Sequence, residues 1–133
     1  MRQVIVGTYE FGYDQAQLVL RAGNGGEFNM IPEAGSVTRI KVGVDQPCWR
    51  DVVAVLMHEI TELVYEKMCC RYSPAYEMGK DHAGYTFVLR HDQFTEATAR
   101  VAEFVAAAIP DLAKAWDRWN KDTKARKGGK AKQ

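Results

Sequence analysis

The stretch that decides the fold is Asp45–Met68, which reads DQPCWRDVVAVLMHEITELVYEKM. Its apolar residues recur at three- and four-residue steps on several sides, a pattern typical of a long helix that lies in a core. Asp45 offers an N-cap oxygen and Pro47 follows as an early proline, two features that commonly open a helix. We therefore predict a central helix that begins here and runs through Met68.

The residues before this helix favour a sheet. Strand-like runs occur at Gln3–Thr8, Ala16–Arg21 and Val37–Val44, and glycine-rich or proline-containing turn sequences separate them, including Gly23–Gly26. This pattern predicts a small, mostly antiparallel sheet at the N-terminus. Residues 71–88, after the central helix, contain proline and glycine and are predicted to form a connecting loop of a length that often carries function.

A second helix is expected from Arg90 to Ile109, because apolar residues again repeat at three- and four-residue steps. Pro110 should end this helix, or open a short amphipathic helix that presents Leu112 and Trp116. The fold class expected from the sequence is therefore α+β: a small, mostly antiparallel N-terminal sheet packed on two long helices, plus a short C-terminal helix.

The length of 133 residues, with 47% hydrophobic and 26% charged residues, suits one globular domain, which we assign to residues 1–120. The net charge of +1 is unevenly distributed. Residues 119–133 hold six Lys or Arg and one Asp, which leaves residues 1–118 with a net charge of −4. Residues 121–133 lack large apolar side chains and are expected to be a disordered basic tail, either solubilising or able to contact nucleic acid weakly through phosphates.

Several classes of protein are disfavoured by the sequence. No apolar run approaches the roughly 20 residues that cross a bilayer, and residues 1–12 lack the apolar block of a signal peptide. Cys48, Cys69 and Cys70 form neither a CxxC pair nor an even set, so a disulfide framework and a cysteine zinc knuckle are not indicated. A cytoplasmic protein that does not contact membranes is expected.

One segment of the central helix carries residues suited to chemistry: His58-Glu59-Ile60-Thr61-Glu62, an HExxE sequence. Positions four apart lie about 40° apart around a helix and one turn apart along it, so His58 and Glu62 can share one ligand. Imidazole and carboxylate both bind divalent metals, and a catalytic zinc ordinarily takes three protein ligands and a water. Glu59 points about 100° away from His58, from where the acid of an HExxH helix takes a proton from that water.

The HExxE segment also has an ordinary structural interpretation. Glu62 and Glu66 would then form the solvated face of an amphipathic helix with Lys67 and Arg71, and His58 would be a hydrogen-bonded core histidine. The metal interpretation is favoured because unpaired His and Glu are costly to desolvate in the helix most suited to burial.

A third metal ligand must come from another part of the chain, and the remaining histidines are His82 and His91. His91 is favoured because it lies near the start of the second long helix, a more rigid platform than the glycine-flanked loop around His82. Asp92 is a candidate to orient a ligand by hydrogen bonding. Tyr85 and His82 are candidates to polarise a substrate carbonyl or stabilise an oxyanion.

With these residues in place, the stretch Val52–Ile109 resembles the short zincin-like metallopeptidases of phage and prophage proteins. In that group a helix with HExxE or HExxH is followed, after a loop, by a helix that opens with a Leu-x-His step, which here is Leu89-Arg90-His91. The resemblance implies one zinc per chain held by His58, Glu62 and His91, with Glu59 as general base and a small sheet before the first helix. Glu62 departs from the usual second histidine of HExxH.

Three functions follow from these residues. The first is a zinc-dependent hydrolase, specifically a small metallopeptidase that acts on a peptide or protein substrate. The second is an HD-type phosphohydrolase in which His91-Asp92, His58 and Asp111 bind the metal, although such folds are helical throughout. The third is a non-enzymatic phage or prophage accessory module, in which the metal is absent or only joins the two helices.

Overall fold

The computed structural model describes residues 2–29, 37–72 and 86–131, with side chains described as far as Arg126. A hairpin forms one side of its main sheet: β1 (Gln3–Phe11) pairs antiparallel with β2 (Asp14–Arg21). The two-residue turn between them begins at Gly12, whose φ of 67° glycine adopts without steric cost. Alternate side chains of β2 are fully buried: Ala16, Leu18 and Leu20. Val19, between Leu18 and Leu20, is 2% exposed, so β2 is buried on both faces at this point.

Two further strands complete a four-stranded sheet in the order β1-β2-β4-β3. β4 (Arg39–Gly43) runs parallel to β2, whereas β3 (Gly26–Phe28) pairs antiparallel with β4 and forms an edge of the sheet. Antiparallel pairs therefore outnumber parallel pairs, as predicted. β3 itself differs from the prediction, because it begins within the glycine-rich stretch expected to form only a turn.

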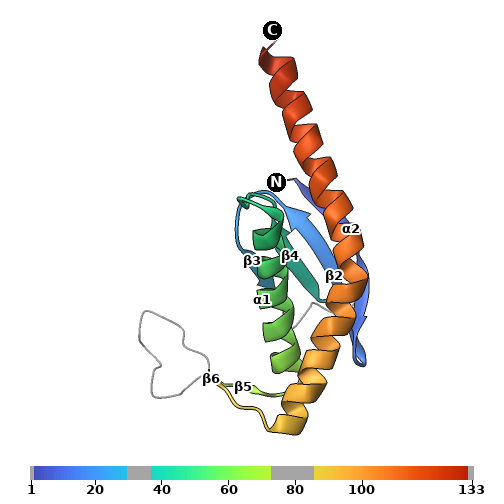
Figure 1. Ribbon diagram of the computed structural model, residues 1–133, viewed down its shortest axis with the longest axis vertical. Coiled ribbons are helices and arrows are strands. Elements are labelled where there is room, and N and C mark those ends of the chain that lie inside the picture. The colour runs from blue at the N-terminus through green and yellow to red at the C-terminus, as the bar shows by residue number, and fades with distance from the viewer. Residues whose placement is uncertain (1, 30–36, 73–85, 132–133) are drawn as a thin grey trace.

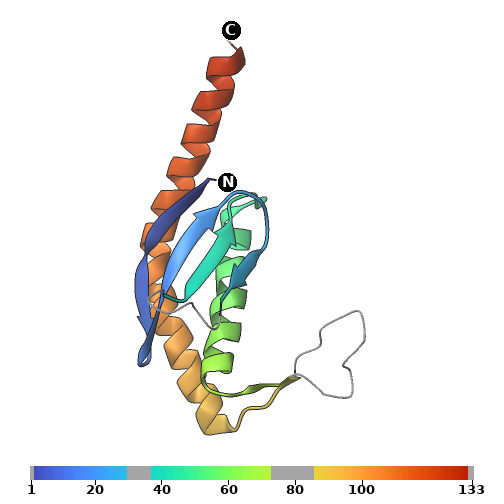
Figure 2. The ribbon, with the colours of Figure 1, turned by 180° about the vertical axis from the view of Figure 1, so that it is seen from behind.

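Two helices cover one face of this sheet (Figure 1), and the opposite face is seen from behind in Figure 2. α1 (Trp49–Lys67) packs on β4 and β3, and α2 (His91–Ala131) packs on β1 and α1. The largest fully buried side chains between these layers are Phe11, Leu18, Leu20, Ile40, Leu56, Ile60, Leu63, Phe104 and Leu112. The predicted α+β class, a mostly antiparallel sheet with two helices, is confirmed, and one of the two helices, α2, is long.

The start of α1 lies later in the sequence than the proline pattern predicts. Cys48 is the N-cap residue, and its side chain makes no capping hydrogen bond. The Asp45 carboxylate instead accepts a hydrogen bond from the Gly23 backbone N–H at 2.9 Å. Asp45 therefore holds the turn between β2 and β3 rather than the end of the helix.

α2 is one continuous helix, so the prediction of a separate short C-terminal helix is wrong. Pro110 lies inside α2 on an exposed side. Buried residues continue past it at steps of three, four or seven residues without a change of phase: Ala97, Val101, Phe104, Ala108, Leu112 and Trp119. Trp116 also donates a hydrogen bond from Nε1 to the Val44 carbonyl at 3.0 Å. Packing on both sides of Pro110 thus compensates for the hydrogen bond that proline cannot donate.

α2 continues to Ala131, past the start of the segment predicted to be a basic tail. Lys, Arg and Ala are strong helix formers, and the helix is extended by contacts around its last buried turn. Lys121 pairs with Asp117 at 2.9 Å, Arg2 pairs with Asp122 at 3.0 Å, and the Thr123 hydroxyl donates to the Trp119 carbonyl. Neither α2 nor the other described helix is long and apolar enough to span a membrane.

The described ends of the connection between α1 and α2 form a small ladder rather than a plain loop. β5 (Arg71–Tyr72) and β6 (Thr86–Phe87) pair antiparallel, in register Arg71 to Phe87. The Phe87 ring packs on the Tyr65 ring of α1 at a centroid distance of 5.1 Å. β6 is thereby held beside the exposed face of α1.

Candidate metal centre

α1 brings three potential metal ligands together at mid-helix. His58 and Glu62 lie one turn apart, and His58 Nε2 is 3.0 Å from Glu62 Oε2. Glu59 joins them, since one ligand atom from each of His58, Glu59 and Glu62 lies within 4.8 Å of the others. The i, i+1, i+4 spacing of the HExxE segment alone produces this grouping. Sequence reasoning therefore identified the three residues correctly as neighbours.

The three side chains differ sharply in exposure. The His58 side chain is 67% exposed and that of Glu62 is 21% exposed, whereas Glu59 retains only 7% of its accessible surface. Glu59 faces β3: a Cβ atom added to Gly26 would lie 2.8 Å from Glu59 Cγ. The group therefore lies where α1 meets the edge strand, open to solvent at His58 and closed at Glu59.

The Glu59 side chain is largely buried, although its carboxylate oxygens keep some contact with solvent. Burial raises its pKa, the nearby His58 lowers it, and the carboxylates of Glu62 and Glu27 raise it further. Among the residues that the structure describes, Glu59 has no hydrogen-bond or ion-pair partner. An unpaired carboxylate with two others nearby makes a local concentration of negative charge, which a cation would relieve.

The geometry of this group suits a divalent metal ion. Ligand atoms about 2.1 Å from a tetrahedral ion are roughly 3.4 Å apart, close to the 3.0 Å between His58 Nε2 and Glu62 Oε2. One imidazole and two carboxylates are ordinary ligands for such ions. The His58-Glu59-Glu62 group can therefore hold a metal ion, and it is the one such group found among the described side chains.

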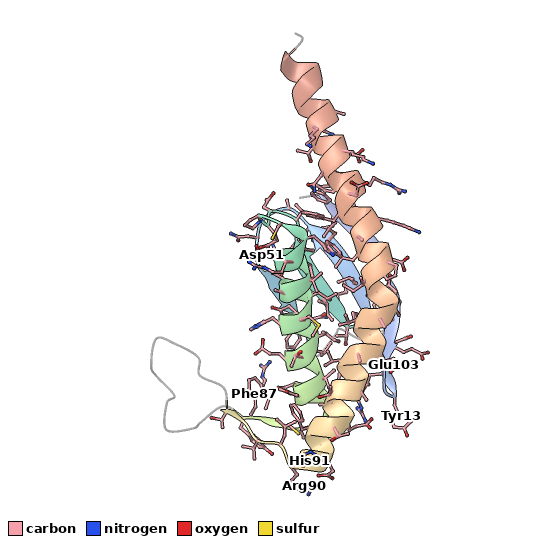
Figure 3. All side chains as sticks on the ribbon, in the orientation of Figure 1. Tyr13, Asp51, Phe87, Arg90, His91 and Glu103 are labelled. Atoms are coloured by element: carbon pink, nitrogen blue, oxygen red, sulfur yellow. The ribbon has the colours of Figure 1, made fainter. Side chains whose placement is uncertain are left out.

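The structure does not bring His91 to this group. His91 is the exposed first residue of α2, at the tip where Figure 3 labels it. His58 lies about two and a half turns, or roughly 14 Å, before the end of α1 that adjoins this tip. α2 and β3 also lie on opposite sides of α1 (Figure 1), and Glu59 faces β3. No sequence pattern reports on which side of α1 the second helix packs.

The other residues singled out from the sequence are distributed as follows. Asp92 is exposed and accepts hydrogen bonds from Arg90, which lower the pKa of its carboxyl group. Asp111 accepts a hydrogen bond from Tyr9 and lies on α2 roughly 30 Å along the axis from His91, so these two cannot share an ion as an HD-type site requires. His82 and Tyr85 lie outside the described residues.

A groove that sequence reasoning did not identify runs along the outer face of α1 beside the metal-ligand group. Its volume is about 430 Å³. The lining residues are Ala54, Met57, His58, Thr61, Glu62, Tyr65 and Phe87. The four-residue spacing of Met57, Thr61 and Tyr65 was visible in the sequence. The contribution of Phe87 to the groove depends instead on the pairing of β5 with β6. The groove joins two metal-ligand candidates to an apolar surface.

Comparisons with protein family models, curated proteins and solved structures find no match to this chain. The interpretation of the site therefore rests on its own geometry.

Proposed function

We propose that the protein is a zinc-dependent hydrolase, specifically a small metallopeptidase of the zincin-like type known from phage and prophage proteins. The observation that carries this proposal is the grouping of the largely buried Glu59 with the His58–Glu62 pair, three potential ligands whose atoms lie within 4.8 Å of one another. Desolvation and the neighbouring carboxylates of Glu62 and Glu27 disfavour the charged form of Glu59, and a bound cation would relieve this penalty.

Each of the three side chains has a separate role in the proposed reaction. His58 and Glu62 would supply two of the three protein ligands that a catalytic zinc ordinarily takes, and their 3.0 Å separation requires little rearrangement for this. When bound, zinc supplies Lewis-acid chemistry, which polarises a carbonyl group and makes water a nucleophile near neutral pH. Glu59 accepts the proton of the attacking water and returns it to the leaving amine. Its raised pKa suits both steps, because a general base works best when its pKa approaches the operating pH.

The proposed substrate is a peptide with a large apolar side chain near the bond that is cleaved. The groove beside His58 and Glu62 is lined by Met57, Tyr65 and Phe87 and has room for such a side chain. β3 is an edge strand on the other side of the metal-ligand group, so an extended peptide can add to it by backbone hydrogen bonds.

Metal analysis with peptide hydrolysis tests this function. The purified chain is expected to retain about one zinc after dialysis and to cleave a fluorescence-quenched peptide library, with faster cleavage beside Phe or Leu. Glu59→Gln should keep the zinc and lower the rate by roughly 10²- to 10⁴-fold, the usual contribution of a general base. A chain that binds no metal, or a Glu59→Gln variant with wild-type turnover, would contradict the proposal.

His58→Ala and His91→Ala form a matched pair of variants. Zinc affinity should fall in His58→Ala, because the variant removes a ligand, and should be unchanged in His91→Ala, because His91 lies at the far end of α1. Loss of zinc in His91→Ala would instead support the ligand set implied by the sequence resemblance.

A second function is a metal-binding module without catalysis. It is favoured by the proximity of Glu59, whose oxygen lies within 4.8 Å of the other two ligand atoms and could itself bind the ion. All three ligands would then come from α1, so the ion would not join α1 to α2. Glu59→Gln distinguishes this function, since zinc affinity should then fall as strongly as in His58→Ala.

A further inference from the structure

The last third of α2 extends beyond the sheet in both ribbon views (Figures 1 and 2). Trp119 is the last buried residue of the helix, and residues 120–131 continue for roughly 18 Å. No described residue beyond Trp119 has a large apolar side chain, so this part of α2 does not offer the apolar face that insertion into a lipid surface needs. Any partner of this part of α2 would therefore have to be polar.

Basic side chains form a stripe along this part of α2. Lys114, Arg118, Lys121 and Lys124 follow one another at steps of four, three and three residues, which keeps them within one side of the helix, and all four are exposed. We call these four residues the basic stripe. The buried side chains Leu112 and Trp119 lie on the other side of the helix, so the stripe faces away from the core.

The acidic residues near the basic stripe are already engaged by other groups. Asp111 accepts a hydrogen bond from the Tyr9 hydroxyl at 2.7 Å, and Asp122 pairs with Arg2. Asp117 pairs with Lys121 of the stripe itself. Within the described part of the chain, Lys114, Arg118 and Lys124 have no acidic partner at ion-pair distance, so three cations remain available to a partner.

A hollow beside the basic stripe adds to its capacity for anions. It lies between β1 and α2 and has a volume of about 310 Å³. Arg2, Lys114 and Arg118 line it together with Trp119, over whose ring the Arg2 guanidinium lies at 4.1 Å. Cations of α2 and Arg2, which precedes β1, therefore line one space large enough for a phosphate group, together with the Asp111 carboxylate.

We propose that the basic stripe binds the phosphate backbone of duplex DNA, a function separate from the proposed hydrolysis. Evenly spaced cations on a straight helix match the regular phosphates of a duplex. A helix about 10–12 Å in diameter fits the roughly 12 Å major groove of B-DNA, whereas the major groove of duplex RNA is too deep and narrow to admit it. Contacts of this kind are independent of base sequence, because phosphates carry no sequence information.

Fluorescence anisotropy with a labelled 20-base-pair duplex tests the proposal across sodium chloride concentrations. Binding is expected in the micromolar range, with a salt slope of about −0.9 per phosphate contacted; three contacts would give roughly a fortyfold weakening between 50 and 200 mM salt. Lys114→Gln/Arg118→Gln/Lys124→Gln should lower the affinity at least tenfold at low salt and reduce the salt slope by about two to three.

The matched control is Arg39→Gln/Arg50→Gln/Arg90→Gln, which removes the same charge from exposed positions away from the basic stripe. The control should bind the duplex within about twofold of the wild type. Thermal unfolding of both variants shows whether the helix remains folded. Equal losses of affinity in the two variants, or no duplex binding, would overturn the proposal. Tighter binding to a duplex RNA of equal length would overturn the choice of DNA.

Discussion

At the scale of single residues, Gly26 controls the space that Glu59 occupies. A Cβ atom at this position would lie 2.8 Å from both Glu59 Cγ and Val55 Cγ1, and 3.1 Å from the Lys41 carbonyl oxygen. Gly26→Ala is therefore expected to destabilise the fold by about 1–3 kcal/mol, as overpacking does. Urea unfolding monitored by circular dichroism measures this loss.

The same substitution tests whether Glu59 is the residue that Gly26 accommodates. Glu59→Ala removes the Cγ atom, so Gly26→Ala should cost less in that background, with a coupling of roughly 0.5–3 kcal/mol in a double-mutant cycle. An additive cycle would show that Glu59 does not lie against Gly26. Neither substitution alters His58 or Glu62. A difference in zinc content between Glu59→Ala and the wild type therefore reports on Glu59.

The candidate ligands illustrate how far the sequence alone predicts a site. His58, Glu59 and Glu62 are neighbours because helical spacing makes them so, and that spacing is read directly from the sequence. The burial of Glu59 cannot be read from the sequence, since it depends on Gly26 of β3, which lies against it. The position of His91 depends on the packing of two helices, which local periodicity does not encode.

At the scale of secondary structure, the position of Pro110 inside α2 allows a prediction about stability. Proline in a helix interior is about 3 kcal/mol less favourable than alanine, and its effect on the unfolded chain offsets about 1 kcal/mol of this. Pro110→Ala should therefore stabilise the protein by roughly 1–2 kcal/mol in urea unfolding. The control Ala107→Gly, at an exposed position one turn earlier, should cost about 1 kcal/mol.

A neutral or destabilising Pro110→Ala would indicate that the helix is interrupted at this proline. The continuity of α2 was in principle visible in the sequence. Phe104, Ala108, Leu112 and Trp119 keep one phase across Pro110, and all four are buried. The local rule that proline ends a helix is overridden here because a continuous apolar stripe packs on β1 and α1.

At the scale of the whole molecule, the sheet and α2 are joined by contacts between residues distant in sequence. Arg2 pairs with Asp122, the Gly12 N–H donates to Glu103, and the Trp116 indole donates to Val44. The order of the strands in the sheet also depends on contacts between residues distant in sequence. Runs of β-forming residues predicted strands, but the parallel pairing of β2 with β4 and the place of β3 depend on long-range contacts.

The bond from the Tyr9 hydroxyl to Asp111, 2.7 Å long, offers a pH-dependent test of how β1 is joined to α2. Burial raises the pKa of Tyr9, as do its hydrogen bond to Asp111 and the charge of that carboxylate. Because the folded state favours the neutral phenol, the stability from this contact is fully present below about pH 10, the ordinary pKa of tyrosine, and is lost as the pH rises above it. Tyr9→Phe should therefore cost about 1 kcal/mol at pH 7, the usual worth of such a bond.

The unfolding free energies of Tyr9→Phe and the wild type, measured in urea between pH 7 and pH 11, should converge above pH 10, where the wild type alone loses this contribution. Tyr13→Phe is the matched control, because Tyr13 is 99% exposed and its hydroxyl makes no hydrogen bond within the described structure. It should match the wild type throughout. A constant difference between Tyr9→Phe and the wild type across this range would show that the hydroxyl contributes through packing rather than through its bond to Asp111.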